Sequence, residues 1–189
     1  MKIGIDIDEV IVEFARGYFE FYNSKHGTLF KFEDAFTYDL WKVLGVSKEK
    51  SIQLADDYYK TESFRNIEIV KDSIEKIKEL SGKHEIFIVT SRPVSIRKQT
   101  ADFFKKVLDG IPLKIVYSGD FFGGQGKNKA ELCTELGLSF FIEDNKKFAL
   151  ECAQRGVKVV LLDKPWNRDA IHENISRVNG WEEIPGKIK

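Results

Sequence analysis

Short apolar runs alternate along this chain with longer stretches in which apolar residues recur at helical spacing. Strands that are buried on both faces, as in parallel sheets, contain continuous apolar runs rather than alternating polar and apolar residues. Runs of this kind occupy residues 2–7, 85–89, 114–117, 139–142 and 157–162. Amphipathic stretches fill the intervals at 72–80, 96–108 and 129–136. The alternation predicts an α/β fold with a doubly wound parallel sheet.

One interval, between the first apolar run and residue 72, breaks this alternation. It spans about sixty residues without a strand-like run, whereas a crossover within a sheet needs far fewer. The interval holds 13 of the 24 aromatic residues of the chain. We therefore expect a small helical lobe at residues 13–71, inserted between core segments at 1–12 and 72–189. Ser47 is the expected N-cap of a helix that runs through Tyr59.

Composition limits the partners and the environment that we expect. The chain has 189 residues, of which 42% are apolar, and its 30 basic residues balance its 30 acidic ones. A chain without net charge offers no global field for a polyanion, so no nucleic-acid polymer is expected as a partner. No run approaches the roughly 18 apolar residues that cross a membrane, and the acidic start of the chain is unlike a secretory signal. These features predict a globular cytoplasmic protein, and a homodimer is compatible with them.

Polar side chains gather where the predicted strands end. The carboxyl ends of parallel strands meet at one edge of a sheet, and ligands bind there at the point where the strand order reverses. The candidates at or just after the ends of the first, second and fourth runs are Asp6 and Asp8, then Thr90, Ser91 and Arg92, then Glu143, Asp144 and Asn145. A loop with three glycines leads to two lysines at the start of a helix: Gly123, Gly124, Gly126, Lys127 and Lys129. We expect these groups to converge on one edge.

Each of these pieces also has a purely structural interpretation. The two early aspartates suit an Asx turn and a helix cap, and Glu143 with Asp144 could cap the next helix. Thr90 and Ser91 could cap the helix that follows them, and Lys129 could be a solvated helix residue. Capping explains any one piece but not their joint occurrence at three strand ends and one loop. The pattern as a whole therefore favours a functional site.

The residue types at these positions suit phosphoryl transfer. Carboxylates from two strand ends form an oxygen-only site of the kind that Mg²⁺ prefers. A lysine and a hydroxyl add positive charge and hydrogen-bond donors for a phosphoryl group. One carboxylate can attack phosphorus and form an aspartyl-phosphate, while a second protonates the leaving oxygen and later activates water. The predicted reaction is the hydrolysis of a phosphomonoester.

At these residues the chain resembles the haloacid dehalogenase-like (HAD) superfamily of phosphatases. The segments that carry the resemblance are Asp6-Ile-Asp8-Glu-Val10, Ile88-Val-Thr90-Ser91-Arg92, Lys129, and Phe141-Ile-Glu143-Asp144-Asn145. The resemblance implies a Rossmann-like core with a helical type 1 cap after the first strand. The 5′(3′)-deoxyribonucleotidase branch is similar in further features: Val10, the Thr-Ser-Arg run, the short cap and the segment Arg177-Val-Asn-Gly-Trp181-Glu-Glu-Ile184.

The resemblance implies a role for each catalytic position. Asp6 would be the nucleophile and a Mg²⁺ ligand, and Asp8 would be the general acid and base, with its backbone carbonyl on the metal. Lys129 would neutralise the negative charge that develops at phosphorus. Asp144 would be the third protein ligand of Mg²⁺, and Glu143, where many relatives have aspartate, would contact the metal directly or through water.

The resemblance also implies how the phosphate is held. The Thr90 hydroxyl and the Ser91 backbone N–H would bind the phosphoryl oxygens. Lys127 competes with Lys129 for the lysine position, but Lys129 directly precedes the predicted helix. Lys127 and Arg92 are therefore expected to make outer phosphate contacts.

The branch resemblance implies a nucleoside monophosphate as the substrate, with its phosphate on the metal and its base against the cap. Aromatic side chains stack on bases. Phe14, six residues after Asp8, is the best-placed aromatic residue for this contact, and Phe36 and Trp41 are weaker candidates. The base and sugar preference cannot be read from the chain.

Two alternatives remain open from the sequence. A phosphatase of sugar phosphates or other small phosphoesters would share every catalytic residue and differ only in the cap. A catalytically silent relative that binds a nucleotide or a partner belongs to another class, and the intact carboxylates argue against it. A P-loop is excluded, because the chain lacks a glycine five positions before Gly126.

Overall fold

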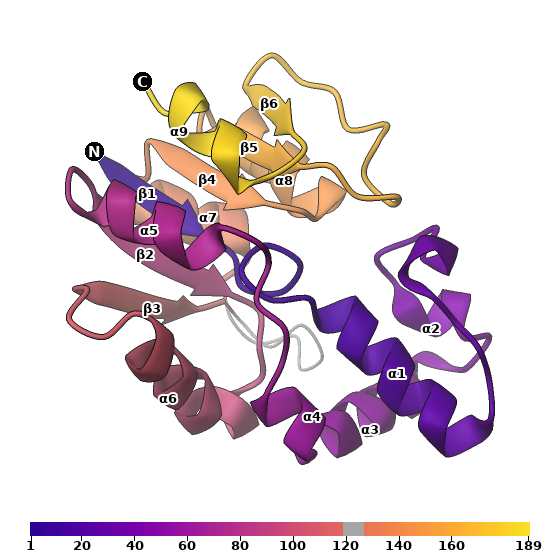
Figure 1. Cartoon of the computed structure of the whole chain (residues 1–189). Helices are drawn as coiled ribbons and strands as arrows, with labels where there is room; N and C mark the ends of the chain where they lie inside the picture. The colour runs from indigo at the N-terminus through magenta and orange to yellow at the C-terminus, as the bar shows by residue number, and fades with distance from the viewer. Residues whose placement is uncertain (119–126) are drawn as a thin grey trace.

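The computed structural model describes residues 1–118 and 127–189, and within them six parallel strands form one sheet (Figure 1). The strands are β1 (Lys2–Ile5), β2 (Glu85–Thr90), β3 (Leu113–Tyr117), β4 (Phe140–Glu143), β5 (Lys158–Leu162) and β6 (Ile175–Val178). Their order across the sheet is β3-β2-β1-β4-β5-β6. The chain thus moves outward from β1 to one edge and then resumes at β4 on the other side. This confirms the predicted doubly wound sheet and puts its switch point between β1 and β4.

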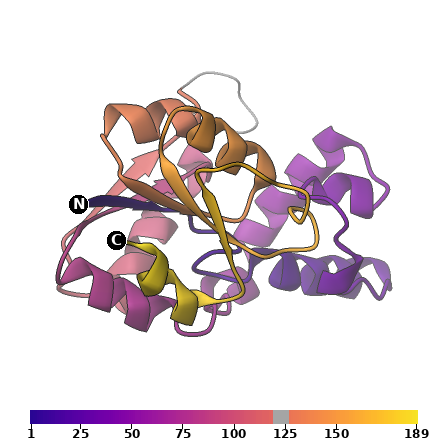
Figure 2. The same cartoon turned by 90° about the horizontal axis from the view of Figure 1, so that it is seen from above.

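Helices cover both faces of the sheet. One face packs against α5 (Ser73–Ser81), α6 (Arg97–Val107) and α9 (Ile184–Lys187), and the other against α7 (Lys129–Glu135) and α8 (Lys146–Gln154). The side chains of β2 alternate between the two layers, since Ile88 joins the first apolar cluster and Val89 the second. Short 3₁₀ turns at Val94–Ile96 and Trp181–Glu183 precede α6 and α9. Figure 2 shows this layered arrangement from above.

Two differences from the sequence prediction exceed a one-residue shift at the end of an element. The first strand ends at Ile5 rather than at residue 7, because the chain turns there: the Ile7 carbonyl accepts hydrogen bonds from the N–H groups of Ile11 (2.7 Å) and Val12 (3.1 Å). The last strand, β6, was not predicted. It has four residues, lies at the edge of the sheet and is only partly buried, so it lacks the continuous apolar run of the inner strands.

Helices follow the turn after β1 and lie beyond the carboxyl ends of the strands (Figure 1). These elements are α1 (Phe14–His26), a 3₁₀ turn (Phe32–Asp34), α2 (Leu40–Val43), α3 (Lys48–Tyr59) and α4 (Glu62–Arg65). Ser47 caps α3 as predicted, since its hydroxyl accepts a hydrogen bond from the Lys50 N–H at 3.2 Å. We call residues 13–71 the cap, in keeping with the predicted division of the chain.

The aromatic residues of the cap pack against one another and are continuous with the α5, α6 and α9 side of the core. Phe14 lies 5.6 Å from Tyr58 and 5.7 Å from Tyr18 between ring centroids. Most of the cap's aromatic surface is therefore used in packing, as expected. Among the helices built from the described residues, none has both the length and the apolar character needed to cross a bilayer.

Candidate active site

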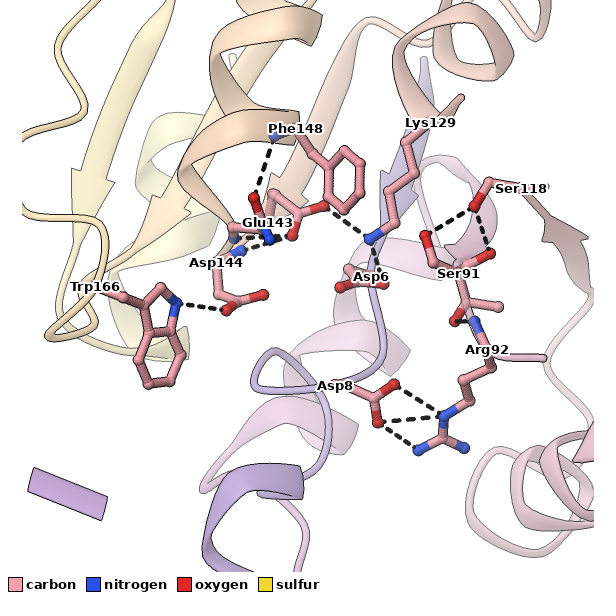
Figure 3. A network of polar contacts seen from close by, with 12 residues as sticks. Asp6, Asp8, Ser91, Arg92, Ser118, Lys129, Glu143, Asp144, Phe148 and Trp166 are labelled. Atoms are coloured by element: carbon pink, nitrogen blue, oxygen red, sulfur yellow. Dashed lines mark hydrogen bonds and ion pairs between the residues drawn. The ribbon is translucent and has the colours of Figure 1, made fainter. Parts of the chain in front are cut away.

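A buried lysine joins the ends of three elements at the switch point. Lys129 Nζ lies 2.8 Å from Asp6 Oδ1 and 3.1 Å from Glu143 Oε2 (Figure 3). Asp6 follows β1, Glu143 ends β4, and Lys129 begins α7. The start of α7 is fixed by a capping box, in which Asn128 Oδ1 accepts from the Glu131 N–H and Glu131 Oε2 accepts from the Asn128 N–H. The capping box therefore fixes the start of α7, which places the Lys129 side chain beside the acids.

Asn145, and not the acid pair before it, caps helix α8. Asn145 Oδ1 accepts a hydrogen bond from the Lys147 N–H at 2.9 Å. Glu143 Oε1 instead accepts from the backbone N–H groups of Asp144 (3.1 Å) and Asn145 (2.9 Å). The capping interpretation of Glu143 and Asp144 is thus wrong, and both carboxylates remain turned toward the site.

Asp144 is held on one oxygen only. Its Oδ2 accepts a hydrogen bond from Trp166 Nε1 at 3.0 Å, and its backbone carbonyl accepts from Asn167 Nδ2 at 2.6 Å. The other oxygen, Oδ1, is buried and has no hydrogen-bond partner among the residues that the structure describes. A buried, unpartnered carboxylate oxygen is costly unless a ligand completes it.

The acidic residues fit a divalent metal ion. One carboxylate oxygen from each of Asp6, Glu143 and Asp144 lies within 4.8 Å of the others, and all three side chains are buried. The donor set is entirely oxygen, which suits Mg²⁺, and the unpartnered Oδ1 of Asp144 is free for such a ligand. The carboxylate of Asp8 is not part of this cluster.

Burial and mutual repulsion shift the pKa values of the cluster upward. Desolvation, together with Glu143 and Asp8, raises the pKa of Asp6 to about 8 against the opposing attraction of Lys129. Desolvation, followed by the charge of Glu143, raises the pKa of Asp144 well above its usual value. Burial disfavours the ammonium of Lys129, but the attraction of Asp6 and Glu143 outweighs it and raises the lysine's pKa. Ionised together, the three acids would carry more negative charge than one lysine balances, which is the electrostatic condition for binding a cation.

The second aspartate of the loop after β1 is paired with an arginine. The Asp8 carboxylate accepts hydrogen bonds from Arg92 Nη2 at 2.7 Å and from Arg92 Nε at 3.1 and 3.2 Å (Figure 3). The guanidinium is almost fully buried, and its carbon lies 5.2 Å from the ring centroid of Phe64 in the cap. Arg92, for which outer phosphate contacts are predicted, pairs with Asp8 in this structure and also lines the cavity beside it.

The hydroxyl groups after β2 are linked to β3. Ser91 Oγ lies 2.8 Å from Ser118 Oγ, and Ser118 Oγ donates a hydrogen bond to the Thr90 carbonyl at 3.1 Å. Thr90 Oγ1 accepts from the Arg92 N–H at 3.1 Å, so this turn is held from both sides. Ser118 was not predicted as a site residue, although it directly follows a predicted strand.

Lys127 points away from the site. Its Nζ pairs with both carboxylate oxygens of Glu135 at 2.6 and 2.7 Å, and its side chain is about half exposed. The structure thus brings Lys129, and not Lys127, to Asp6. The predicted glycine-rich loop with Gly123, Gly124 and Gly126 lies outside the described residues.

A cavity opens between this cluster and the cap. Asp6, Asp8, Ser91, Arg92 and Lys129 line one side. The cap lines the other with mostly aromatic and apolar side chains: Phe14, Tyr18, Tyr38, Leu40, Trp41, Ala55 and Tyr59. The two sequence candidates Phe14 and Trp41 are thus at the cavity. Phe36 is 68% exposed and is not among its lining residues.

Several residues at the cavity were not identified from the sequence, among them Glu9, Tyr38 and Trp166. All three line the cavity. Burial raises the pKa of Tyr38 well above its usual value, and the negative charges of the nearby acids raise it further. Tyr38 is one of many aromatic residues in the cap, so nothing in the sequence distinguishes it from the residues that only pack. Trp166 follows β5 by four residues, and the strand-end rule applied to that strand would have identified it.

Comparison with known proteins identifies the family. Residues 1–188 match the family described as 5′ nucleotidase, deoxy (pyrimidine), cytosolic type C protein (NT5C). The chain is 32% identical over 189 residues to a nucleotidase of Clostridium acetobutylicum. The alignment covers 100% of this chain and 93% of the relative. It is 26% identical over 189 residues to a 5′(3′)-deoxyribonucleotidase of Bacillus subtilis, with coverage of 98% and 97%.

A solved structure agrees with the fold. A haloacid dehalogenase-like hydrolase of Streptococcus pneumoniae aligns with a TM-score of 0.71 at 15% identity, over 100% of this chain and 98% of the other. At this identity the likeness concerns the fold, whereas the family follows from the match over almost the whole sequence. The chain belongs to the NT5C family of nucleotidases, which are phosphatases, and its fold is that of a haloacid dehalogenase-like hydrolase.

Proposed function

We propose that this protein is a Mg²⁺-dependent nucleotidase that hydrolyses nucleoside or deoxynucleoside monophosphates through an aspartyl-phosphate. The observation that carries the proposal is the convergence of Asp6, Glu143, Asp144 and Lys129 beside an aromatic-lined cavity, in a chain of the NT5C family. Three acids and one ammonium suit a metal and a phosphoryl group. The aromatic wall suits a base.

In the first half of the reaction, an Asp6 carboxylate oxygen attacks phosphorus. A bond forms between that oxygen and phosphorus while the bond from phosphorus to the ester oxygen breaks. Asp8 gives a proton to the ester oxygen, which leaves as the hydroxyl of the nucleoside. Lys129, already 2.8 Å from Asp6, orients the nucleophile and stabilises the negative charge on the phosphoryl oxygens.

In the second half, water releases the phosphate. The Asp8 carboxylate takes a proton from the water, whose oxygen attacks phosphorus as the bond to Asp6 breaks. The paired hydrogen bonds from Arg92 hold Asp8 in a defined orientation for both proton transfers. The Thr90 hydroxyl and the Ser91 N–H bind the phosphoryl oxygens in this scheme.

Asp6, Glu143, Asp144 and the backbone carbonyl of Asp8 are the groups proposed to hold the metal. When bound, Mg²⁺ supplies positive charge that neutralises the acids and the phosphoryl oxygens. The need for such charge is supported by the raised pKa values of Asp6 and Asp144. It is also supported by the unpartnered Asp144 Oδ1.

The cap, residues 13–71, is proposed to select the substrate. Phe14 and Trp41 line the cavity opposite the acids and offer aromatic faces to a base. Phe14 is also packed against Tyr18 and Tyr58, and Lys42 Nζ lies 5.1 Å from the centroid of the Trp41 ring. One chain supplies all these groups, and the homodimer and the cytoplasmic location remain predictions.

The proposal is tested by measuring phosphate release from ribo- and deoxyribonucleoside 5′- and 3′-monophosphates and from sugar phosphates. Release should favour nucleotides, stop on addition of EDTA, and return with excess Mg²⁺. Asp6→Asn should fold normally and show no turnover, because the amide cannot act as the nucleophile. Release from sugar phosphates alone would refute the nucleotide assignment, and activity that resists EDTA would refute the metal. Turnover by Asp6→Asn would refute the covalent step.

A further inference from the structure

We propose that Trp166 is a positioning residue that couples the orientation of the Asp144 carboxylate to the docking of the cap. The inference rests on the proposed metal site and adds a residue to it. Trp166 lies four residues after the end of β5, on a loop that contacts both the acid cluster and the cap. It therefore connects the two halves of the site.

On the acid side, Trp166 fixes how Asp144 is rotated. Its Nε1–H donates to Asp144 Oδ2 at 3.0 Å, and both side chains are buried (Figure 3). With Oδ2 engaged, Oδ1 is left as the unpartnered oxygen that can serve the metal. Hydrogen bonds from neighbouring residues that orient a metal-binding carboxylate change metal affinity by about 10- to 100-fold.

On the cap side, the indole is in contact with two aromatic rings. Its ring centroid lies 5.5 Å from that of Phe32 and 6.5 Å from that of Tyr38, both in edge-to-face geometry. Lys164, on the same loop, reaches back to Glu9 at 3.5 Å and lies 5.5 Å from the Phe32 ring centroid. The cap thus forms one wall of the space in which the indole is held.

The base of this loop is anchored to the core, so the indole is the part that depends on the cap. Asn167 Nδ2 donates to the carbonyls of Leu162 (2.8 Å) and Asp144 (2.6 Å). Arg177, in β6, donates to Asn167 Oδ1 at 2.6 Å and to Asp163 Oδ1 at 2.8 Å. The backbone position of the loop is therefore set by the sheet, whereas the orientation of the indole is set jointly by Asp144 and the cap.

The test measures the Mg²⁺ affinity of the substrate-free protein by isothermal titration calorimetry. Trp166→Phe removes the N–H donor and keeps an aromatic ring, so the Mg²⁺ dissociation constant should rise about 10-fold or more. Phe32→Ala removes one of the two rings that pack against the indole and leaves the acids unchanged. The Mg²⁺ dissociation constant should then rise about threefold. Phe36→Ala is the matched control, because Phe36 lies in the same part of the cap but is exposed and away from the cavity. It should leave the constant within about twofold of wild type.

Thermal unfolding of each metal-free variant separates positioning from stability. Positioning predicts weaker Mg²⁺ binding that does not follow the loss of stability across the variants. A Trp166→Phe protein that is folded and binds Mg²⁺ as tightly as wild type overturns the inference. If Trp166→Phe does not fold, equal Mg²⁺ affinity in Phe32→Ala and Phe36→Ala overturns it as well. Absence of Mg²⁺ binding by the wild-type protein would instead refute the proposed metal site.

Discussion

Lys129 Nζ lies 2.8 Å from Asp6 Oδ1, and both side chains are almost fully buried. The Lys129 ammonium thus places a positive charge beside the cluster of three buried acids, and it also contacts Glu143. An ion pair in such a place is worth little as a stabilising device, because desolvation offsets the attraction. It is better understood as a pre-oriented charge for a reaction in which negative charge develops.

Replacement of this lysine should be far more damaging than replacement of its neighbour. Lys129→Ala should lower kcat by about 100-fold or more, because a buried charge that stabilises the transition state is lost. Lys127→Ala, which breaks an exposed pair with Glu135, should change kcat by less than about threefold. Steady-state phosphate release compares the two variants. Similar small losses in both would contradict the assignment of Lys129.

The stability of the metal-free protein should fall as pH rises. The pKa of Asp6 is about 8 in the folded protein and 3.8 in a free side chain, mainly through burial, so between these values the folded state binds more protons than the unfolded state. Stability from this group is therefore fully present below about pH 4 and is lost as pH rises toward 8. Asp6→Asn has no ionisable group at this position, so its stability should depend less on pH.

Thermal midpoints of wild type and Asp6→Asn, measured in EDTA from pH 5 to 8, check this prediction. The difference between the two proteins isolates Asp6 from other groups, such as His84, whose lowered pKa acts in the opposite direction. Mg²⁺ should raise the wild-type midpoint most at pH 8, where fewer protons compete for the acids. Parallel profiles in EDTA would show that Asp6 is ionised throughout.

Asp8→Asn should separate the two halves of the reaction. A leaving group of low pKa, such as p-nitrophenol, departs without a proton donor, so the first half should still proceed on p-nitrophenyl phosphate. The second half should stall, because the amide cannot take a proton from water. Rapid mixing should thus give a burst of about one equivalent of p-nitrophenol per enzyme followed by almost no turnover. Wild-type steady-state rates would contradict the acid–base role of Asp8.

The aromatic residues of the cap that line the cavity should affect KM for nucleotides and not KM for small phosphoesters. Trp41→Ala should raise KM for a preferred nucleoside monophosphate about 5- to 150-fold, which is the range expected for one lost base–aromatic stack. Its effect on glycerol phosphate hydrolysis should be small, because that substrate has no ring to stack. Phe36→Ala, an exposed aromatic residue of the same cap, is the control and should leave both KM values unchanged. An equal rise of KM for both substrates would indicate general damage to the cavity.

The architecture and much of the acid cluster can be predicted from the chain alone. Parallel strands buried on both faces require continuous apolar runs, and five of the six described strands, among them the edge strand β3, were visible as apolar runs. Because the carboxyl ends of parallel strands meet at one edge, residues as distant as Asp6 and Glu143 could be expected side by side. The edge strand β6, which is only partly buried, lacked this signal.

The tertiary structure alone decided the partners of the polar groups that meet from distant parts of the chain. Asp8 and Arg92 are 84 positions apart, and no local pattern distinguishes an arginine that binds phosphate from one that orients a carboxylate. The same holds for Trp166, which binds Asp144 across 22 positions. Periodicity encodes which face of an element is buried, whereas these pairings depend on how separate elements meet in space. Strand-end spacing therefore located the site, and only the packing of the loops and the cap determined how its residues are connected.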